Sequence, residues 1–319
     1  MFYKGKVALV TGGTGFVGFH IAQALLKRGA KVRVTMHKRP IALPNPNLEL
    51  VVADLSQQAD CLHAMEGVQY VFHAAGAVAS AAVKNPMSAI TQNLVLTSQV
   101  LQAAWSAQVE RLLLFGSSTA YPALEHPVKE DEMWSGDPHP SYFGYGWMRR
   151  YLEKMGEFVH KHSNTKIAIV RPTAIYGTHD NFDLATCHVI PALIRKAVER
   201  FDPLEVWGTG NEERDILHVS DLAYGCLLML EKYATADPIN IGKGESVTIK
   251  ELVKSILRAA GYEKANVIFD ANKPRTIDKR IVDIAKAREI LGFSPAISLD
   301  EGLRNTVEWY KVYSAKDTR

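Results

Sequence analysis

A tyrosine followed four residues later by an arginine is the pair in this chain best suited to proton transfer. Tyr145 and Arg149 stand in the run Tyr-Phe-Gly-Tyr-Gly-Trp-Met-Arg-Arg at residues 142–150. Residues at this spacing lie on one face of a helix, where the cation favours the ionised form of the phenol. Such a phenol can protonate the alkoxide that forms when a hydride reduces a carbonyl. The structural alternative is an aromatic helix start with two solvated arginines.

Hydroxyl side chains follow an apolar run upstream of this tyrosine. Ser117, Ser118 and Thr119 come soon after Leu112–Phe115. The run predicts a buried strand, and ligands bind beyond the carboxyl ends of the strands in a parallel sheet. We therefore expect Ser117 and Tyr145 to converge on one site.

Three glycines near the N-terminus predict a dinucleotide site. The apolar run Val7–Val10 precedes Gly12, Gly15 and Gly18, and the amphipathic run Phe19–Arg28 follows. The first glycine permits a tight turn, the second lets the backbone approach a pyrophosphate, and the third lets the helix pack close to the strand. The N–H groups at the helix start then face the phosphates. A merely structural turn is the alternative.

The residues after the second predicted strand distinguish the two nicotinamide dinucleotides. An acidic residue there binds the adenosine ribose of NAD, whereas a basic one meets the 2′-phosphate of NADP. Met36 stands at the expected acidic position, and His37, Lys38 and Arg39 follow it. The sequence predicts NADP(H), with Lys38 or Arg39 as the phosphate partner. NAD, or a solvated basic turn with no ligand, is the alternative.

Two further strand ends suit the same ligand. Asp54 and Leu55 follow the third predicted strand and are expected to contact the adenine. Ala74, Ala75 and Gly76 follow the fourth, where small residues leave room for the nicotinamide ribose.

Alternating strand and helix signals describe the elements that must position these residues. This alternation predicts an α/β fold with a Rossmann-type, doubly wound parallel sheet. The predicted strands are Val7–Val10, Val32–Thr35, Leu48–Val52, Tyr70–Ala74, Leu112–Phe115 and Lys166–Arg171, and the predicted helices are Phe19–Arg28, Gln58–Met65, about 87–107 and about 142–160.

The pattern loses its regularity after Pro172 and indicates a smaller C-terminal α/β substrate lobe. We expect a dinucleotide-binding domain at 1–173, with returns at about 214–241, and a substrate lobe formed by 174–213 and 242–319. Pro238–Gly242 is expected to be one more buried strand that returns to the main sheet.

Composition excludes several classes of function. A net charge of +3, without basic runs, argues against nucleic acid as a partner. No apolar stretch approaches the length of a membrane span, and no signal pattern opens the chain. Three scattered cysteines predict a reducing cytoplasm rather than disulfides, and no histidine or cysteine pair has metal-ligand spacing.

The spacing Gly-x-x-Gly-x-x-Gly at 12–18, together with Ser117, Tyr145 and residue 149, resembles the extended short-chain dehydrogenase/reductases of the NAD-dependent epimerase/dehydratase family. That family acts on nucleotide sugars with a Ser/Thr–Tyr–Lys triad. Arg149 stands where the family has lysine. Arginine keeps the positive charge but cannot be deprotonated, and it donates hydrogen bonds in a planar fork. The resemblance therefore implies electrostatic activation of Tyr145 without a proton relay through residue 149.

Within this family the chain is similar to the GDP-L-fucose synthases, which are NADP-dependent epimerase/reductases of GDP-4-keto-6-deoxymannose. The likeness is densest at 171–196, 206–210 and 214–222. It implies that His188 is the epimerisation acid and that the substrate is bound by Lys196, Trp207 and Arg214. Two cations suit a diphosphate, and an indole can cover a base or a sugar. The resemblance also implies a homodimer through the two long helices.

The predicted site thus has three groups of residues. The catalytic group is Ser117, Thr119, Tyr145, Arg149 and His188. The group expected to contact the dinucleotide is Gly12, Thr14, Gly15, Phe16, Val17, Gly18, His37, Lys38, Arg39, Asp54, Leu55, Ala74, Ala75, Gly76, Tyr145, Arg149, Pro172, Ile175 and His188. The group expected to contact the substrate is Ser118, Asn181, Lys196, Trp207 and Arg214, and no metal ligand is predicted.

Residue 119 bears on the reaction. The synthases have a cysteine there as the base for epimerisation, whereas this chain has Thr119. A threonine hydroxyl alone is a poor base for a proton next to a ketone. The predicted reaction is reduction at C4 of a GDP-4-keto-6-deoxyhexose, with or without epimerisation at C3 and C5. Two alternatives stay open: a nucleotide-sugar 4-epimerase with tightly bound NAD, and a catalytically weak dinucleotide-binding regulatory protein.

Overall fold

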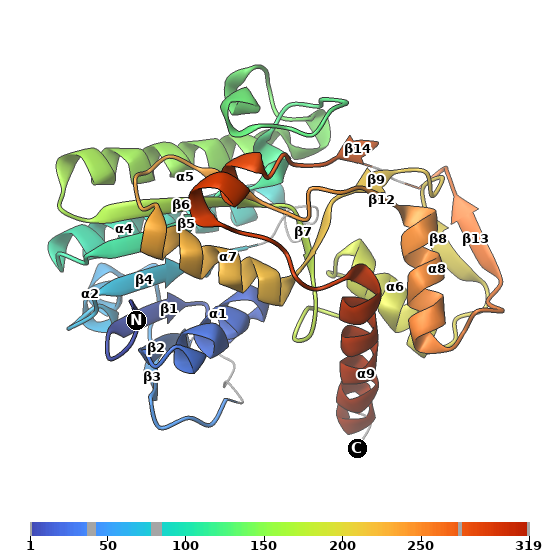
Figure 1. Cartoon of the computed structure of the whole chain (residues 1–319), viewed down its shortest axis with the longest axis horizontal. Coiled ribbons are helices and arrows are strands. Elements are labelled where there is room, and N and C mark those ends of the chain that lie inside the picture. The colour runs from blue at the N-terminus through green and yellow to red at the C-terminus, as the bar shows by residue number, and fades with distance from the viewer. Residues whose placement is uncertain (1, 37–42, 78–84, 274–275, 318–319) are drawn as a thin grey trace.

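A seven-stranded parallel sheet forms the centre of the computed structural model, which describes residues 2–36, 43–77, 85–273 and 276–317. The strand order is β11–β6–β5–β4–β1–β2–β3, and all neighbours run parallel, so their carboxyl ends share one edge (Figure 1). The strands are β1 (Val7–Thr11), β2 (Lys31–Met36), β3 (Leu48–Val52), β4 (Tyr70–His73), β5 (Arg111–Phe115), β6 (Lys166–Pro172) and β11 (Ile239–Ile241). The predicted Rossmann-type sheet is confirmed, including the late strand that returns to its edge.

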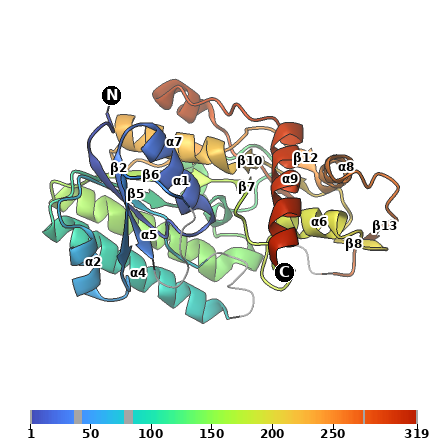
Figure 2. The same ribbon diagram turned by 90° about the horizontal axis from the view of Figure 1, so that it is seen from below.

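Helices cover both faces of this sheet (Figure 2). Successive residues of a strand point to opposite faces, so Val10 packs in one hydrophobic cluster and Leu9 in the other. The helices on the Val10 side are α1 (Phe16–Lys27) and α7 (Val219–Lys232), and those on the Leu9 side are α2 (Gln58–Ala64), α4 (Pro86–Ser106) and α5 (Phe143–His162).

The helix after the glycine turn begins earlier than predicted. The amphipathic pattern suggests a start at Phe19, whereas α1 starts at Phe16. Gly15 is the N-cap residue, with extended backbone at φ −90° and ψ 178°. Apolar periodicity follows the buried face of a helix and does not mark a first turn whose side chains face a ligand. The correction brings the helix N-terminus to the glycine turn itself.

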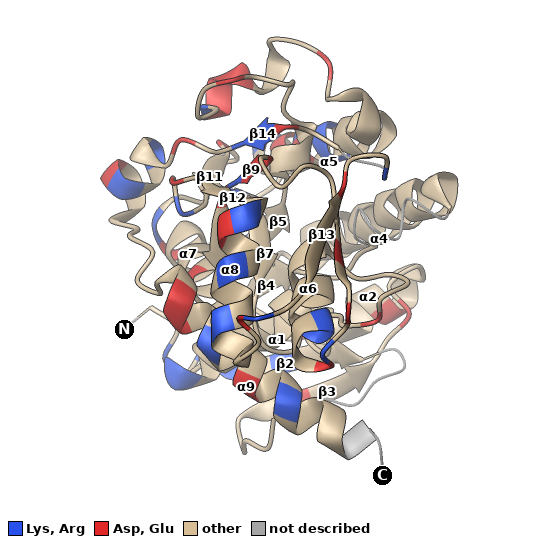
Figure 3. Cartoon of the chain, turned by 90° about the vertical axis from the view of Figure 1, so that its right-hand side faces the viewer, with Lys and Arg blue, Asp and Glu red and all other residues tan. Residues whose placement is uncertain are grey.

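A third hydrophobic cluster lies beside the sheet and contains residues from the second half of the chain. Its helices are α6 (Val189–Val198), α8 (Ile249–Ala260) and α9 (Leu299–Asp317), and its small sheets pair β8 (Leu204–Trp207) with β13 (Val267–Asp270) and β7 (Ala174–Tyr176) with β10 (Ile216–His218). A three-stranded sheet joins β12 (Val247–Thr248), β9 (Glu213–Arg214) and β14 (Lys279–Arg280). Figure 3 shows α6, α8 and β13 on this side of the molecule. Short helical turns occur at Ser118–Ala120 (η1), Glu130–Trp134 (η2), Pro140–Tyr142 (η3) and Ala287–Leu291 (η4).

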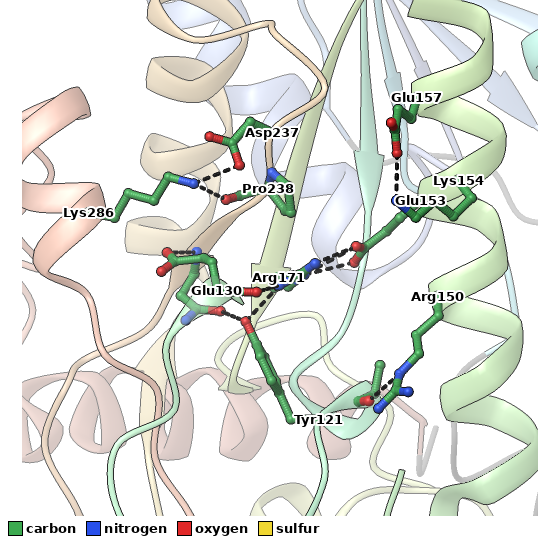
Figure 4. Close-up of polar contacts among 12 residues, drawn as sticks. Tyr121, Glu130, Arg150, Glu153, Lys154, Glu157, Arg171, Asp237, Pro238 and Lys286 are labelled. Atoms are coloured by element: carbon green, nitrogen blue, oxygen red, sulfur yellow. Dashed lines mark hydrogen bonds and ion pairs between the residues drawn. The ribbon is translucent and has the colours of Figure 1, made fainter. Parts of the chain in front are cut away.

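A buried polar network ties α5 to the sheet (Figure 4). Arg171 of β6 donates to Glu153 of α5 at 2.7 Å, and the two side chains are 2% and 6% exposed. Arg171 also donates to the Tyr121 hydroxyl at 2.9 Å, and that hydroxyl donates to Asn240 of β11 at 2.7 Å. Buried charges need such additional hydrogen bonds to offset their lost hydration. The network therefore fixes α5, the helix that carries Tyr145, against β6 and β11.

No helix in the described ranges is both long enough and apolar enough to cross a membrane.

Candidate active site

Tyr145 and Arg149 are in direct contact on α5. Arg149 donates to the Tyr145 hydroxyl through Nη2 at 2.5 Å and through Nε at 3.1 Å, and it donates through Nη1 to the carbonyl of Phe115 at 3.2 Å. Tyr145 is 8% exposed, and its hydroxyl lies 3.4 Å from the carbonyl of Ala77. A phenol oxygen that accepts two charge-assisted hydrogen bonds is well suited to give up its own proton. The structure thus brings together the phenol and the cation, both predicted to be catalytic, at the end of β5.

Ser117 and Thr119 form a hydroxyl pair beside this helix. Their side-chain oxygens lie 2.8 Å apart, and the Thr119 backbone N–H donates to Ser117 Oγ at 3.2 Å. η1, which begins at Ser118, packs against α5. A Cβ on Gly146 would stand only 3.2 Å from the Thr119 carbonyl. The hydroxyl pair and Tyr145 therefore belong to adjoining turns at the same end of the sheet.

A buried histidine that the sequence analysis does not assign lies near the Tyr145–Arg149 pair. His73 at the end of β4 has Nδ1 2.8 Å from Thr11 Oγ1 and Nε2 3.1 Å from Thr97 Oγ1. Burial, with the nearby charge of Arg149 acting in the same direction, lowers the pKa of His73 to about 3, so the ring is neutral at pH 7. Thr11 Oγ1 also accepts from the Ala75 N–H at 3.3 Å. In the sequence, only the position of His73 at the end of a predicted strand could have identified it.

The glycine turn has the geometry of a diphosphate cradle. Gly12 has φ +66°, and a Cβ there would lie 2.7 Å from the Cα of Ala75. A Cβ on Gly18 would collide with the carbonyl of Gly12. No side chain caps α1 at Gly15, and its first turn carries no acidic residue. The exposed N–H groups and the positive end of the helix dipole therefore suit the pyrophosphate of a dinucleotide.

Most of the other residues predicted to contact the dinucleotide lie at the same carboxyl edge. Asp54 and Leu55 follow β3, Ala74–Gly76 follow β4, and Pro172 ends β6, while Ile175 lies in β7. Asp54 accepts from the backbone N–H and the hydroxyl of Ser56 at 2.9 and 2.7 Å. Thr14 lies in the glycine turn, and Phe16 and Val17 begin α1, whereas the predicted partners His37, Lys38 and Arg39 fall outside the described residues.

Asn181 and His188 lie at the two ends of the segment that precedes α6. The Asn181 side chain donates to Thr186 Oγ1 at 2.9 Å and accepts from the Asp183 N–H at 3.1 Å. His188 is exposed as the N-cap residue of α6, and desolvation by neighbouring atoms lowers its pKa below the ordinary value. Among the described residues no hydrogen bond joins either side chain to Tyr145.

The predicted substrate residues Lys196, Trp207 and Arg214 come from α6, β8 and β9. Lys196 Nζ donates to the carbonyl of Glu205 at 2.7 Å, and Trp207, which lies two residues later on β8, is exposed. Arg214 donates to the carbonyls of Glu213 and Asp278 at 2.8 and 3.2 Å. The fifth substrate residue, Ser118, is buried at the start of η1.

Sequence reasoning missed a second arginine beside Arg214. Arg280 of β14 is the register partner of Arg214 and is 6% exposed. Burial lowers the pKa of both, that of Arg280 to about 10. Within the described ranges Nε of Arg280 has no hydrogen-bond partner, although its Nη atoms donate to two backbone carbonyls. Only strand pairing brings residues 214 and 280 together, so no local motif could have linked them.

Comparison with known proteins places this arrangement in a family. GDP-L-fucose synthase from Escherichia coli (strain K12) is 32% identical over 317 residues, which cover 94% of this chain and 95% of that protein. A dTDP-4-dehydro-6-deoxy-D-allose reductase from a Streptomyces species is 28% identical, and the match covers 98% of each chain. The crystal structure of UDP-glucose 4-epimerase from Thermotoga maritima superposes with a TM-score of 0.87 at 26% identity, covering 97% of this chain and 99% of that one.

The family model described as "NAD dependent epimerase/dehydratase family" matches residues 8–242, a range that runs from the glycine turn through β11. That range contains Ser117, Tyr145 and Arg149. The chain belongs to the NAD dependent epimerase/dehydratase family.

Proposed function

We propose that this protein is an NADP(H)-dependent oxidoreductase that reduces the C4 ketone of a GDP-4-keto-6-deoxyhexose. The observation that carries the proposal is the bond from Arg149 to the Tyr145 hydroxyl, with the Ser117 hydroxyl on the adjoining turn. The match to a GDP-L-fucose synthase and to a nucleotide-sugar reductase supports it.

Three residues near the end of β5, Ser117, Tyr145 and Arg149, have different proposed roles in the reduction. When bound, the nicotinamide supplies the hydride. Ser117 donates a hydrogen bond to the ketone oxygen, and Tyr145 gives its phenolic proton to the same oxygen as negative charge develops there. Arg149 then stabilises the phenolate through its two N–H groups.

The cofactor preference rests on the basic turn. The open N-terminus of α1 suits the pyrophosphate of either dinucleotide. Lys38 and Arg39 are proposed to hold the 2′-phosphate, because Met36 leaves no carboxylate there for the ribose hydroxyls of NAD. Direct titration with the two oxidised dinucleotides tests this, and tighter binding of NAD would contradict it.

The proposal covers C4 reduction with or without epimerisation at C3 and C5. His188 is the proposed acid for epimerisation, whereas the Thr119 hydroxyl, bonded to Ser117, is a poor base. The reaction of GDP-4-keto-6-deoxymannose in deuterated water separates the two cases. Deuterium at C3 and C5 of the product shows epimerisation, and its absence in a C4-reduced product shows a simple reductase.

A second candidate function is a nucleotide-sugar 4-epimerase with tightly bound NAD. Two observations favour it. The chain superposes on a UDP-glucose 4-epimerase. Beside Ser117 stands Thr119, which is a poor base, and a 4-epimerase needs no such base because it oxidises and re-reduces a single carbon. Purified protein that carries stoichiometric nicotinamide and turns over without added NADPH would support the epimerase and refute the reductase.

Tyr145→Phe tests whether the site is catalytic. The variant lacks only the hydroxyl, so we expect turnover to fall by about 10²–10⁴-fold while dinucleotide affinity is retained. Steady turnover by Tyr145→Phe contradicts the proposed acid. Wild-type protein that binds the cofactor but turns over no sugar nucleotide would instead support a regulatory protein.

The third cluster and the long helices have proposed roles as well. We propose that 174–213 and 242–319 form the substrate lobe, because Lys196, Trp207 and the Arg214–Arg280 pair lie there or at its border. We also propose a homodimer through α4 and α5. The free thiols of Cys61, Cys187 and Cys226 suit the cytoplasm as the proposed compartment.

A further inference from the structure

An exposed indole and a carboxylate are locked together on β8. Trp207, the last residue of the strand, is 56% exposed, and its Nε1–H donates to Glu205 Oε1 at 3.0 Å. Residues two apart on a strand lie on the same side of it, which places both groups on one surface. The hydrogen bond fixes the orientation of the indole, and the exposed part of the ring can stack on a flat ligand.

A lysine completes this surface, which we call the Trp207 patch and define as Glu205, Trp207 and Lys273. Lys273 follows β13, the strand that pairs with β8, and its Nζ lies 3.8 Å from Glu205 Oε1 and 5.9 Å from the centroid of the Trp207 ring. Both charged side chains are 42% exposed. Within the described ranges Oε2 of Glu205 has no hydrogen-bond partner, so it is free to accept from a ligand.

The patch lies next to a proposed phosphate-binding cation. Lys196 Nζ donates to the backbone carbonyl of Glu205 at 2.7 Å. Lys196 is thus tied to the backbone of the strand that carries the patch. Stacking on an aromatic side chain contributes to binding for every base, so it carries no selectivity by itself.

The selectivity comes from the charged pair. A carboxylate only accepts hydrogen bonds, and an ammonium group only donates them. The Watson–Crick edge of guanine presents an acceptor, O6, followed by two donors, N1–H and N2–H₂, which is the complement of a lysine followed by a carboxylate. Uracil and thymine place carbonyls on both sides of their single N–H, and adenine and cytosine present a ring nitrogen acceptor beside their amine. These carbonyls and ring nitrogens repel a carboxylate.

We propose that Glu205, together with Lys273, selects guanine as the base of the nucleotide sugar. The inference rests on the proposed function, which it deepens by assigning the nucleobase preference to two side chains. Glu205 acts as a specificity-determining residue, and Trp207 supplies the stacking platform common to all bases.

Titration of the protein with free nucleoside diphosphates tests this without relying on turnover. The protein is first saturated with its nicotinamide dinucleotide, so that adenine cannot enter the cofactor site, and GDP, IDP, ADP and UDP are then compared by calorimetry. We expect GDP to bind about tenfold or more tightly than ADP or UDP, because a site built to bond N–H groups rejects bases that lack them. IDP, which lacks only the N2 amine, should bind with intermediate affinity.

Glu205→Gln should weaken the binding of GDP about tenfold and leave the binding of UDP nearly unchanged, because the amide N–H₂ would face the N–H donors of guanine. Trp207→Ala should weaken the binding of all four nucleotides by similar factors. Glu308→Gln, which also removes a carboxylate paired with a lysine but on α9, is the matched control and should change nothing.

Equal binding of the four nucleotides by the wild-type protein overturns the proposal, as does a GDP preference that survives in a folded Glu205→Gln variant. The nucleotide-sugar function survives both of those results. Failure of all four to bind overturns the proposed function as well. Equal binding of GDP, IDP and UDP by the wild-type protein overturns the proposal even if Glu205→Gln does not fold.

Discussion

At the scale of single residues, Arg149 determines the surroundings of the Tyr145 hydroxyl. A guanidinium has several N–H donors in one plane, and here two of them bind the Tyr145 hydroxyl while a third binds the Phe115 carbonyl. A lysine has one nitrogen and could not bind both oxygens in the same way. Arg149 thus holds the Tyr145 hydroxyl at the end of β5 and places a positive charge beside it.

Substitutions at residue 149 separate charge from geometry. We expect Arg149→Met to lower kcat by about 10²–10³-fold, because the phenolate loses its charge-assisted hydrogen bonds. Arg149→Lys keeps the charge and should retain most of the rate near pH 7. Unlike arginine, lysine loses its proton at high pH. The rate of the Arg149→Lys variant should therefore begin to fall at a lower alkaline pH than the rate of the wild type. Equal rates for wild type and Arg149→Met would show that the cation has no part in the chemistry.

At the scale of elements, the glycine turn positions the start of α1 against the end of β4. Gly12→Ala combines a left-handed backbone with a Cβ 2.7 Å from the Cα of Ala75. We expect dinucleotide affinity to fall at least tenfold and stability to fall by more than the roughly 1–2 kcal/mol of backbone strain alone. Gly67→Ala is the matched control, since Gly67 has φ +68° and nothing within 4 Å of the added Cβ. It should lower only the melting temperature, and an equal loss of affinity in both variants would refute steric contact as the cause.

The fold could largely be predicted from local sequence patterns. The candidate site could be predicted only in part. Every predicted strand is confirmed to within one residue, because apolar runs mark the buried parts of a parallel sheet. The start of α1 was wrong because its first turn faces the glycine turn rather than the core. His73 and Arg280 were missed because their surroundings come from distant segments: Thr11 of β1 and Thr97 of α4 bind His73, and register with β9 places Arg280 beside Arg214. Contacts between distant segments have no local signature.

The ion pair between β6 and α5 is a second prediction at this scale. Glu153→Gln leaves the guanidinium of Arg171 buried without a counter-charge, and we expect a loss of about 3–5 kcal/mol in the free energy of unfolding. Glu157→Gln lies one turn further along α5, where its ion pairs with Lys154 and Lys161 are largely exposed. That control should change stability by less than about 1 kcal/mol. Denaturant unfolding of both variants measures the difference, and equal losses would show that the buried pair does not hold α5 to the sheet.

At the scale of the whole molecule, α5, which carries Tyr145, and its neighbour α4 present an apolar face. Trp105, Tyr151 and Phe158 are 40%, 59% and 55% exposed along α4 and α5, and they line a hollow of about 670 Å³ between these helices. Exposed apolar surface of this extent on two adjacent helices suits a protein partner. A second copy would bury the same face on each chain, as a two-fold interface requires.

Phe158→Glu should therefore convert the proposed dimer to a monomer, because each chain would bury an unpaired charge in the interface. Light scattering after size exclusion should give twice the chain mass for the wild type and the single-chain mass for the variant. Val312→Glu, at an apolar residue of α9 that is 60% exposed, introduces the same charge elsewhere and should leave the dimer intact. Because α5 carries Tyr145 on its buried side, loss of the partner should also lower the melting temperature and reduce turnover together. A wild-type protein that is monomeric at micromolar concentration would refute the dimer and leave the apolar face to a different partner.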